Sequence, residues 1–350
     1  MQTLARFLVY AATAALLCAL GIVIAFDFLT AANRHVPYSY PQFLIENIAA
    51  PRIIIDAGSS SMIGITPELI EQTFKTPVID VADNGSIPLD AKVYRILDYA
   101  RPGDTLILPL EWVYYTRNIV PQDFINATPN EYAAYYTSQP FFNRLRFVVE
   151  HLSLHNMSDA VRLYLRRDLR EVHTRRILDH MAKQPWGDRK DDGRRKSSVE
   201  HIGCADYIAA SGEIDPIVTW AAQQLATLQA ERRVRIYLTW PAVAGTGCYT
   251  FNDGQLPLAE AARKLYQAHG LTVIGDPKDS LFEPEHMLDT YYHVDSSAAR
   301  IRTERLIARL QTAGMQTGND PRGSTLDLAR QAARSLDVYL PAAPAPTRQD

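Results

Sequence analysis

The sequence predicts an α/β fold, a three-layer parallel-sheet domain with a helical insertion, preceded by one N-terminal transmembrane helix. Short apolar runs alternate with amphipathic segments along most of the chain, which is typical of a parallel sheet covered by helices on both faces. An uncharged apolar segment lies near the N-terminus. The 350 residues are 47% hydrophobic and 21% charged, which excludes a mostly disordered protein.

Residues 1–28 are predicted to form a membrane anchor. Residues 7–26 carry no charge and are long enough to cross a bilayer as a helix. Arg6 precedes this run and Asp27 follows it, so the positive-inside rule places the main domain in the periplasm or another extracytoplasmic space. The run exceeds the usual core of a signal peptide. We therefore expect a single-pass protein of the inner (cytoplasmic) membrane, with a cleaved signal or a buried core helix as alternatives.

An α/β domain is predicted over 51–314, after a polar and aromatic neck at 29–50. In its first part, apolar runs bounded by turn residues predict buried strands. Thr66 suits a helix N-cap, and the following proline suits the first helical position. The expected elements are strands at 52–56, 77–82 and 105–110, a helix opening at 66–67 and a helix at 89–99.

Residues 113–210 interrupt this alternation and predict a helical insertion, aromatic early and basic later. Beyond it, Gly270 suits a helix C-cap, and Asp295 or Ser296 suits an N-cap. Residues 315–350 predict a flexible tail with one possible helix. The later expected elements are helices at 215–230, 257–269, 296–313 and 325–336, and strands at 234–240 and 271–274.

Composition excludes several classes of protein. A net charge of −3 gives no reason to expect a nucleic-acid partner. Three cysteines are too few for a disulfide scaffold, although Cys204 and Cys248 could pair outside the cytoplasm or be unrelated thiols. We expect no cofactor, because glycine-rich phosphate and dinucleotide patterns are absent. We expect no metal, because the histidines of the insertion do not form a convincing zinc set: His151, His155, His173 and His180.

The first candidate for chemistry is the turn at 58–61, Gly-Ser-Ser-Ser, directly after the first predicted strand. Ligands of open α/β sheets bind beyond the carboxyl ends of the strands. A serine there exposes its hydroxyl, and amides at the start of the next helix can stabilise an oxyanion. The alternative is a serine-rich turn without chemical function.

The second candidate is the segment from Asp289 to His293, just before the last long helix. A serine hydroxyl is a weak nucleophile that needs a base, and the base needs a third group to orient it. One loop can supply both. Alone, this segment could also be a surface histidine beside an unrelated aspartate. Together, the two segments predict a Ser-His-Asp site at one edge of the sheet.

These residues resemble the SGNH (GDSL-type) hydrolase-fold family. The chain is similar to its membrane-anchored members, which work beside membrane-bound O-acyltransferases in teichoic-acid D-alanylation and in alginate or cellulose O-acetylation. The resemblance covers roughly 50–112 and 231–313. It rests on IIIDAGSSSM (53–62), DVADNG (80–85), LILPLEW (106–112) and LDTYYHVDSSAARIRTERL (288–306).

The resemblance implies that Ser60 is the nucleophile, with Ser61 as an alternative. Ser59 stands where the family usually has aspartate. The resemblance also implies that His293 is the base and Asp289 its orienting acid. Their spacing, Asp-x-x-x-His, differs from the commoner Asp-x-x-His and leaves the geometry of the triad open.

For the oxyanion hole, the resemblance implies the amides of Ser60 and Gly85. The family also uses an asparagine after the third strand, where this chain has Glu111. Losing such a donor costs on the order of 100–1000-fold in rate. Either Asn84 substitutes, or the hole is weaker, or a partner completes it. Glu111 itself could be a structural hydrogen-bonding residue or have a direct catalytic role.

The leading hypothesis is an extracytoplasmic serine-dependent O-acyltransferase or esterase that acts on a cell-surface or secreted polysaccharide through a covalent acyl-enzyme. The resemblance implies a multi-spanning membrane O-acyltransferase as partner. The alternative is a catalytically weak or inert SGNH-like scaffold of a membrane acyltransferase or polysaccharide synthase complex. A third hypothesis is a periplasmic esterase without a partner.

Overall fold

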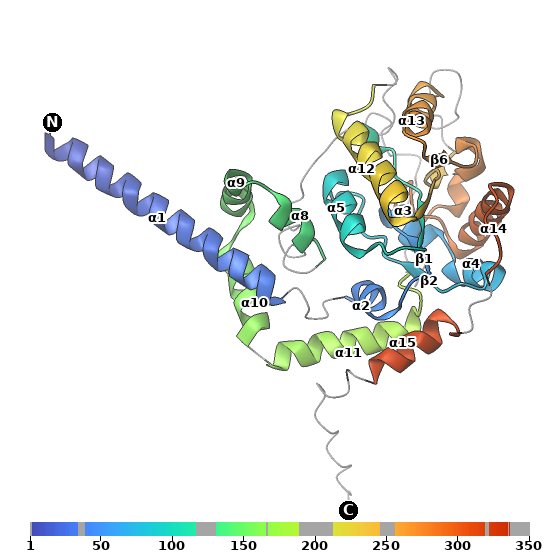
Figure 1. Ribbon diagram of the computed structural model, residues 1–350, viewed down its shortest axis with the longest axis horizontal. Helices are drawn as coiled ribbons and strands as arrows, with labels where there is room; N and C mark the ends of the chain where they lie inside the picture. Colours follow the sequence, from blue (N-terminus) through green and yellow to red (C-terminus); the bar gives the residue numbers. More distant parts are fainter. Residues whose placement is uncertain are drawn as a thin grey trace, which may run out of the picture.

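A computed structural model describes residues 2–33, 39–116, 131–165, 167–188, 213–245, 256–318, 322–334 and 336. An α/β body carries a long N-terminal helix, α1 (Gln2–Asn33), that projects away from it (Figure 1). This helix is long and apolar enough to cross a membrane. The prediction of one N-terminal apolar helix is therefore confirmed, and the helix extends five residues beyond the expected boundary at 28.

The core of the body is a five-stranded sheet in the order β2-β1-β3-β4-β6. Every pair of neighbouring strands is parallel, as the alternation of apolar runs and helices predicted. Each strand falls within a predicted run: β1 (Ile53–Ile55), β2 (Val78–Asp80), β3 (Thr105–Leu108), β4 (Arg235–Leu238) and β6 (Thr272–Val273).

Helices cover both faces of this sheet, so the three-layer α/β prediction is confirmed. Successive side chains of a strand point to opposite faces. Ile54 belongs to one buried cluster, with residues of α5 (Leu89–Tyr99), α12 (Pro216–Arg232) and α13 (Leu256–Ala268). Its neighbours in β1 belong to a second cluster, with residues of α4 (Pro67–Phe74) and α14 (Ser296–Thr312). Figure 1 shows α5 and α12 on one side of the strands and α4 and α14 on the other.

Local signals set most helix boundaries. The Asp295 carboxylate accepts a hydrogen bond from the amide of Ala298 and caps α14. Asp215 caps α12 in the same way. Gly270 has a φ of +74°, the left-handed conformation that favours glycine after a helix. Thr66 precedes α4 as expected, but its side chain makes no capping hydrogen bond.

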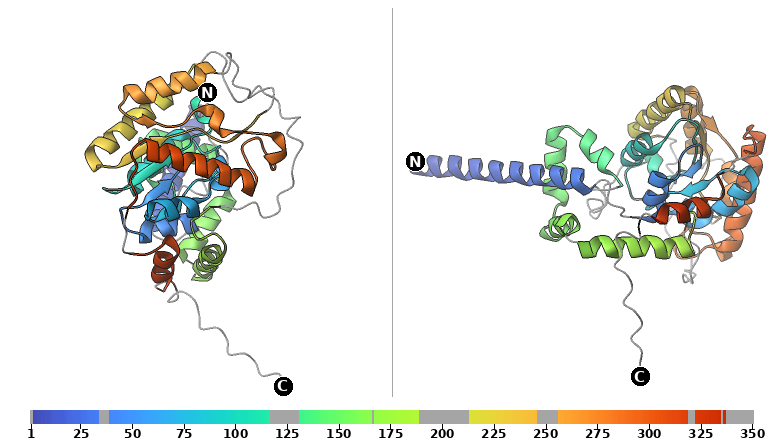
Figure 2. Two further views of the ribbon diagram at one scale, coloured as in Figure 1. Left: turned by 90° about the vertical axis from the view of Figure 1, so that its right-hand side faces the viewer. Right: turned by 60° about the horizontal axis from the view of Figure 1, so that its bottom comes forward.

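The insertion is helical where it is described. It contains α6 (Val113–Thr116), α8 (Ala133–Ser138), α9 (Phe141–His151), α10 (Leu154–Leu165) and α11 (Arg167–Lys183). Helices α8, α9 and α10 contact α1, and α11 contacts α2 (Tyr40–Asn47) and α15 (Thr325–Ala333). Figure 2 shows α9 and α10 flanking the C-terminal part of α1.

A helix in the neck and a second sheet are among the elements that were not predicted. The neck contains α2, capped by Ser39, and a small parallel sheet pairs β5 (Val243–Ala244) with β7 (Leu281–Phe282). Cys204, Cys248 and half of the tail (319–321, 335 and 337–350) lie outside the described residues, whereas the helix expected near 325–336 is present as α15.

Candidate functional site

The serine turn lies at the carboxyl end of β1, where the fold predicts ligand binding. Gly58 is the N-cap of α3 (Ser59–Gly64). A Cβ atom built on Gly58 would lie 2.6 Å from Cδ of Glu111, so only glycine fits without a shift of Glu111. The turn therefore positions Ser60 in the first turn of α3, directly against Glu111 in the segment after β3.

Glu111 occupies one of the two amides that were expected to stabilise an oxyanion, that of Ser60. Its Oε1 accepts a hydrogen bond from the Ser60 amide at 2.9 Å, and its Oε2 accepts one from the Gly58 amide at 2.8 Å. Gly85 borders the same carboxylate, since a Cβ there would lie 3.7 Å from Cδ of Glu111. Burial raises the pKa of Glu111, while Lys92 and the two amides oppose that shift. The Glu111 carboxylate therefore lies directly on two amides of the serine turn.

The Ser60 hydroxyl is fully buried. It accepts a hydrogen bond from the Ala242 amide at 3.1 Å and lies 3.4 Å from Nη1 of Arg302. The Arg302 guanidinium also donates to the carbonyls of Ser60, at 2.7 Å, and of Trp240, at 3.2 Å. Burial lowers the pKa of Arg302 to about 10. The neighbouring Ser61 hydroxyl is buried and has no hydrogen-bond partner among the described residues.

His293 and Asp289 form a close pair. Nδ1 of His293 lies 2.6 Å from Oδ1 of Asp289. Thr290 tightens the loop, because its hydroxyl accepts a hydrogen bond from the His293 amide at 3.2 Å. A carboxylate on Nδ1 favours the tautomer in which that nitrogen carries the proton and Nε2 can accept one. The four-residue spacing between the two residues is thus compatible with the orientation of a general base.

The structure brings some of the expected residues together. The loop carrying His293 packs on the serine helix, since a Cβ at Gly64 would lie 3.0 Å from the next loop residue, Val294. Within the described chain, however, the hydrogen bonds of the Ser60 hydroxyl go to Ala242 and Arg302, and none joins it to His293. The exposed Asn84 side chain accepts a hydrogen bond from the Ser86 amide in its own turn.

Buried charges hold the loops around this site. Arg95 bridges Asp56, at 2.5 Å, and Asp83, at 2.8 Å. Lys92 forms an ion pair with Asp83 and donates to the Ala57 carbonyl, next to the serine turn. Burial raises the pKa of Asp83, but Arg95 and Lys92 outweigh this and hold it below its usual value. The network ties the loops after β1 and β2 to α5.

Sequence reasoning missed Arg302, Lys92 and Arg95 as site residues. A signal for Arg302 was present: it lies four residues after Ala298 and four before Leu306, on the buried face of α14. A charged residue on an apolar face indicates a specific buried partner. The sequence also did not predict a second pair of a histidine with an aspartate, in which His286 lies 3.2 Å from Asp295, the N-cap of α14.

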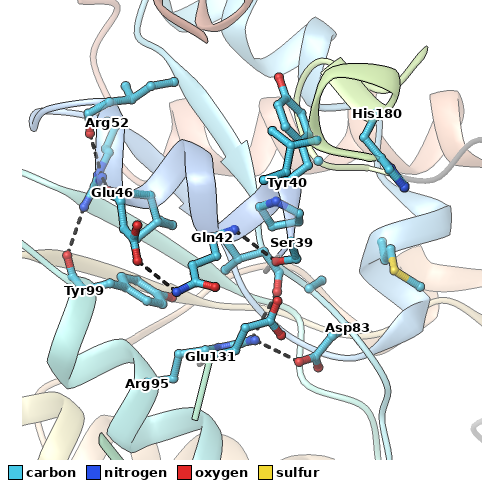
Figure 3. Close-up of a pocket in the computed structure, with 18 of the residues that line it drawn as sticks. Ser39, Tyr40, Gln42, Glu46, Arg52, Asp83, Arg95, Tyr99, Glu131 and His180 are labelled. Atoms are coloured by element: carbon cyan, nitrogen blue, oxygen red, sulfur yellow. Dashed lines mark hydrogen bonds and ion pairs between the residues drawn. The ribbon is translucent and has the colours of Figure 1, made fainter. Parts of the chain in front are cut away.

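A cavity of about 860 Å³ lies between α2, α5 and α11. Figure 3 shows charged and aromatic side chains around it, among them Arg52, Arg95 and Glu131. Met62 and Asp83 also line it, which connects its wall with the serine helix and the loop after β2. In the described ranges, no group of three or more His, Cys, Asp or Glu side chains is arranged to hold a metal ion.

No protein-family model matches the chain, and no curated protein matches its sequence. Among solved structures, the chain is similar to the crystal structure of protein YxiM from Bacillus subtilis, with 12% identity and a TM-score of 0.32. The alignment covers 77% of this chain and 59% of that chain. This chain therefore spans less than two thirds of the length of YxiM.

Proposed function

We propose that the chain is a membrane-anchored serine acyltransferase or esterase whose site is closed in its resting conformation. Ser60 is the nucleophile, His293 the base and Asp289 the group that orients the base. The substrate is an ester or other acyl donor, and the acceptor is a polysaccharide hydroxyl or water. The observation that carries this proposal is the 2.6 Å pair of His293 and Asp289 on a loop packed against the serine helix.

In this mechanism, the Ser60 hydroxyl leaves the Ala242 amide and attacks the acyl carbonyl carbon. His293 takes the serine proton at Nε2 and returns it to the leaving group. The acyl-enzyme then reacts with an acceptor hydroxyl, whose proton passes to the same nitrogen before it returns to Ser60. Asp289 keeps the imidazole in the required tautomer.

Glu111 must move for this chemistry to begin. The developing oxyanion needs the Ser60 amide, which now donates to the Glu111 carboxylate. A negative carboxylate beside an oxyanion also repels it. Each lost donor of an oxyanion hole costs on the order of 100–1000-fold in rate. Displacement of Glu111 by substrate or by a partner would therefore switch the site on.

A fluorophosphonate probe tests the proposal directly. The full chain in detergent would be treated with the probe and read by intact mass, as wild type, Glu111→Asn, Ser60→Ala and His293→Ala. Asparagine is shorter and neutral, so it frees the two amides. We expect Glu111→Asn to label faster than wild type. We expect the adduct to disappear when Ser60→Ala or His293→Ala is combined with Glu111→Asn.

Folding of each variant would be checked by circular dichroism. A folded Glu111→Asn protein that takes up no probe would exclude an activatable Ser60. Labelling that persists in the Ser60→Ala background would assign the nucleophile elsewhere, with Ser61 the first residue to substitute.

The setting of the reaction is also a proposal. An anchored domain outside the cytoplasm has no access to the acyl donors of the cytosol. We therefore infer that a multi-spanning membrane O-acyltransferase delivers the acyl group. The cavity beside Met62 and Asp83 is suited to hold part of a polymeric acceptor. Co-purification of a multi-spanning protein with the full chain, followed by analysis of acylated glycans in a deletion strain, tests both points.

A second candidate function is a catalytically inert partner of a membrane acyltransferase or synthase complex. The buried Ser60 hydroxyl and the occupied amides favour it. The two candidates differ in cells. A strain carrying Ser60→Ala would keep normal acylation of its polymer if the domain is a scaffold, and would lose it if Ser60 forms the acyl-enzyme.

A further inference from the structure

The anchor helix is free along most of its length and enclosed only at its C-terminal end. Side chains before Val23 are almost all exposed. From there, one face of α1 is buried against α8, α9 and α10, which we call the collar. The buried residues of this face are Val23, Phe26, Leu29, Thr30 and Asn33. Phe26 packs edge-on against Tyr136 of α8, with ring centroids 5.1 Å apart.

The collar also neutralises the first charge after the apolar run. Asp27 accepts a hydrogen bond from the Tyr136 hydroxyl at 2.7 Å and pairs with Arg144 of α9 at 2.6 Å. Near the end of the helix, Asn33 donates to the Ala160 carbonyl of α10 at 3.2 Å. These contacts bind α1 to the rest of the chain. Cleavage within or after the apolar run would remove the centre of the collar, so the packing favours a retained anchor.

The length of free helix places the collar at the bilayer surface. Between Arg6 and the first buried residue, α1 offers 16 apolar or small residues, which span ~24 Å at 1.5 Å per residue. The hydrocarbon core of a bilayer is about 30 Å thick. The remaining ~6 Å must come from the part of α1 that the collar surrounds. The collar helices therefore meet the lipid rather than stand above it.

The collar carries large apolar side chains that face outward. Phe142 and Val149 on α9 are 76% and 67% exposed, and Leu165 on α10 is 69% exposed. Phe142 and Val149 are seven residues apart, so they lie on the same face of α9. Figures 1 and 2 show α9 lying across the axis of α1. A helix across a membrane anchor lies along the plane of the bilayer, the orientation of an interfacial amphipathic helix.

We propose that α9 and α10 form an interfacial membrane-binding surface that embeds Phe142, Val149 and Leu165 in the lipid. The occupant of this surface is lipid because the surface continues the lipid-facing side of α1 at the depth where the hydrocarbon ends. Such a surface fixes the height and tilt of the α/β body above the membrane, which a single flexible tether would not do.

Site-specific fluorescence in vesicles tests this surface. The full chain, with its three cysteines replaced by alanine, would receive Phe142→Cys, Val149→Cys or Leu165→Cys and an environment-sensitive NBD label. It would be reconstituted into phosphatidylcholine–phosphatidylglycerol vesicles. Lipids would carry a nitroxide quencher either about 5–10 Å below the headgroups, the depth of interfacial helices, or near the bilayer centre. We expect a blue-shifted emission that the shallow quencher reduces more than the deep one.

Ile301→Cys is the matched control, because Ile301 is an apolar residue 40% exposed on α14, in the α/β body. Its label should keep a water-like emission without quenching by either lipid. Intact mass would confirm that α1 is retained. Water-like emission at all three collar positions would overturn the proposal. A blue shift that grows with protein density and that neither lipid quencher reduces would also overturn the proposal. It would assign the surface to a second copy of the chain.

Discussion

The buried guanidinium of Arg302 offers the sharpest test of how the serine turn is held. Its two terminal nitrogens reach three carbonyls, those of Ser60 at 2.7 Å, Trp240 at 3.2 Å and Gly64 at 3.4 Å. These carbonyls come from α3 and from the loop after β4. Replacing Arg302 with methionine keeps much of the apolar stem and removes every donor.

The size of the effect follows from two opposing contributions. Three buried carbonyls lose a donor, at about 1–3 kcal/mol each. The Ser60 hydroxyl also loses its 3.4 Å contact with Arg302 but keeps the Ala242 amide as a donor. Against this, burial lowers the pKa of Arg302 from its ordinary value to about 10. At 1.36 kcal/mol for each pKa unit, removing the buried charge returns about 3 kcal/mol. We expect a net destabilisation of roughly 3 kcal/mol and a melting temperature lower by roughly 6–12 °C.

Thermal unfolding of the full chain in detergent measures this loss. Trp240 stacks on Trp112 with ring centroids 5.3 Å apart, so near-UV circular dichroism also reports on this side of the site. Arg300→Met is the matched control on the same helix, because Arg300 is exposed and, among the described residues, its ion pair is with Glu304 alone. It should cost about 0.3–0.5 kcal/mol. Equal melting temperatures for the two variants would refute the assigned role of Arg302.

Three further predictions concern the closed site. Gly58→Ala should destabilise the fold by about 1–3 kcal/mol, because its Cβ would meet Glu111, whereas Gly85→Ala should change little, since its Cβ would make an ordinary 3.7 Å contact; parallel thermal melts compare them. Burial raises the folded-state pKa of Glu111, so the stabilisation by its carboxyl is complete below its unfolded pKa and is lost as pH rises through the raised value. Denaturant titrations at acidic and neutral pH should therefore show that the free energy of unfolding falls less between the two pH values for Glu111→Gln than for wild type. An equal fall in the two proteins would contradict this. Asp289→Asn, placed in the Glu111→Asn background, should slow fluorophosphonate labelling by at least about 100-fold, because the imidazole of His293 loses its orienting acid; unchanged labelling kinetics would exclude that role.

Local sequence determined much of the fold. The apolar runs at 52–56 and 105–110 contain β1 and β3, and α5 begins and ends at the predicted residues. These predictions held because hydrophobic periodicity reports directly on which face is buried. Asp295 caps the start of α14, and Gly270 follows the end of α13, each through contacts within a few residues. The short strands β5 and β7 gave no such signal, since two residues establish no period.

The candidate site could be predicted only in part. The serine turn and the segment from Asp289 to His293 follow from residue type and position along the chain, whereas the choice of Ser60 within the turn came from the family resemblance. The contact between His293 and Asp289 spans only four residues. The contact of Glu111 with the amides of Gly58 and Ser60 could not be foreseen. Whether a glutamate after the third strand points into the site or away from it depends on side-chain packing between segments that are about 50 residues apart.

The sequence by itself determined the class of the fold, the apolar helix at the N-terminus and the residue types available for chemistry, because periodicity, capping and composition act over a few turns of chain. Only the tertiary structure decided which groups meet. It placed Glu111 on the amides of the serine turn, Arg302 beneath a serine 242 residues away, and the insertion helices around the C-terminal end of α1. Such contacts depend on how distant segments pack, and no local pattern of residues specifies the partner of a buried charge.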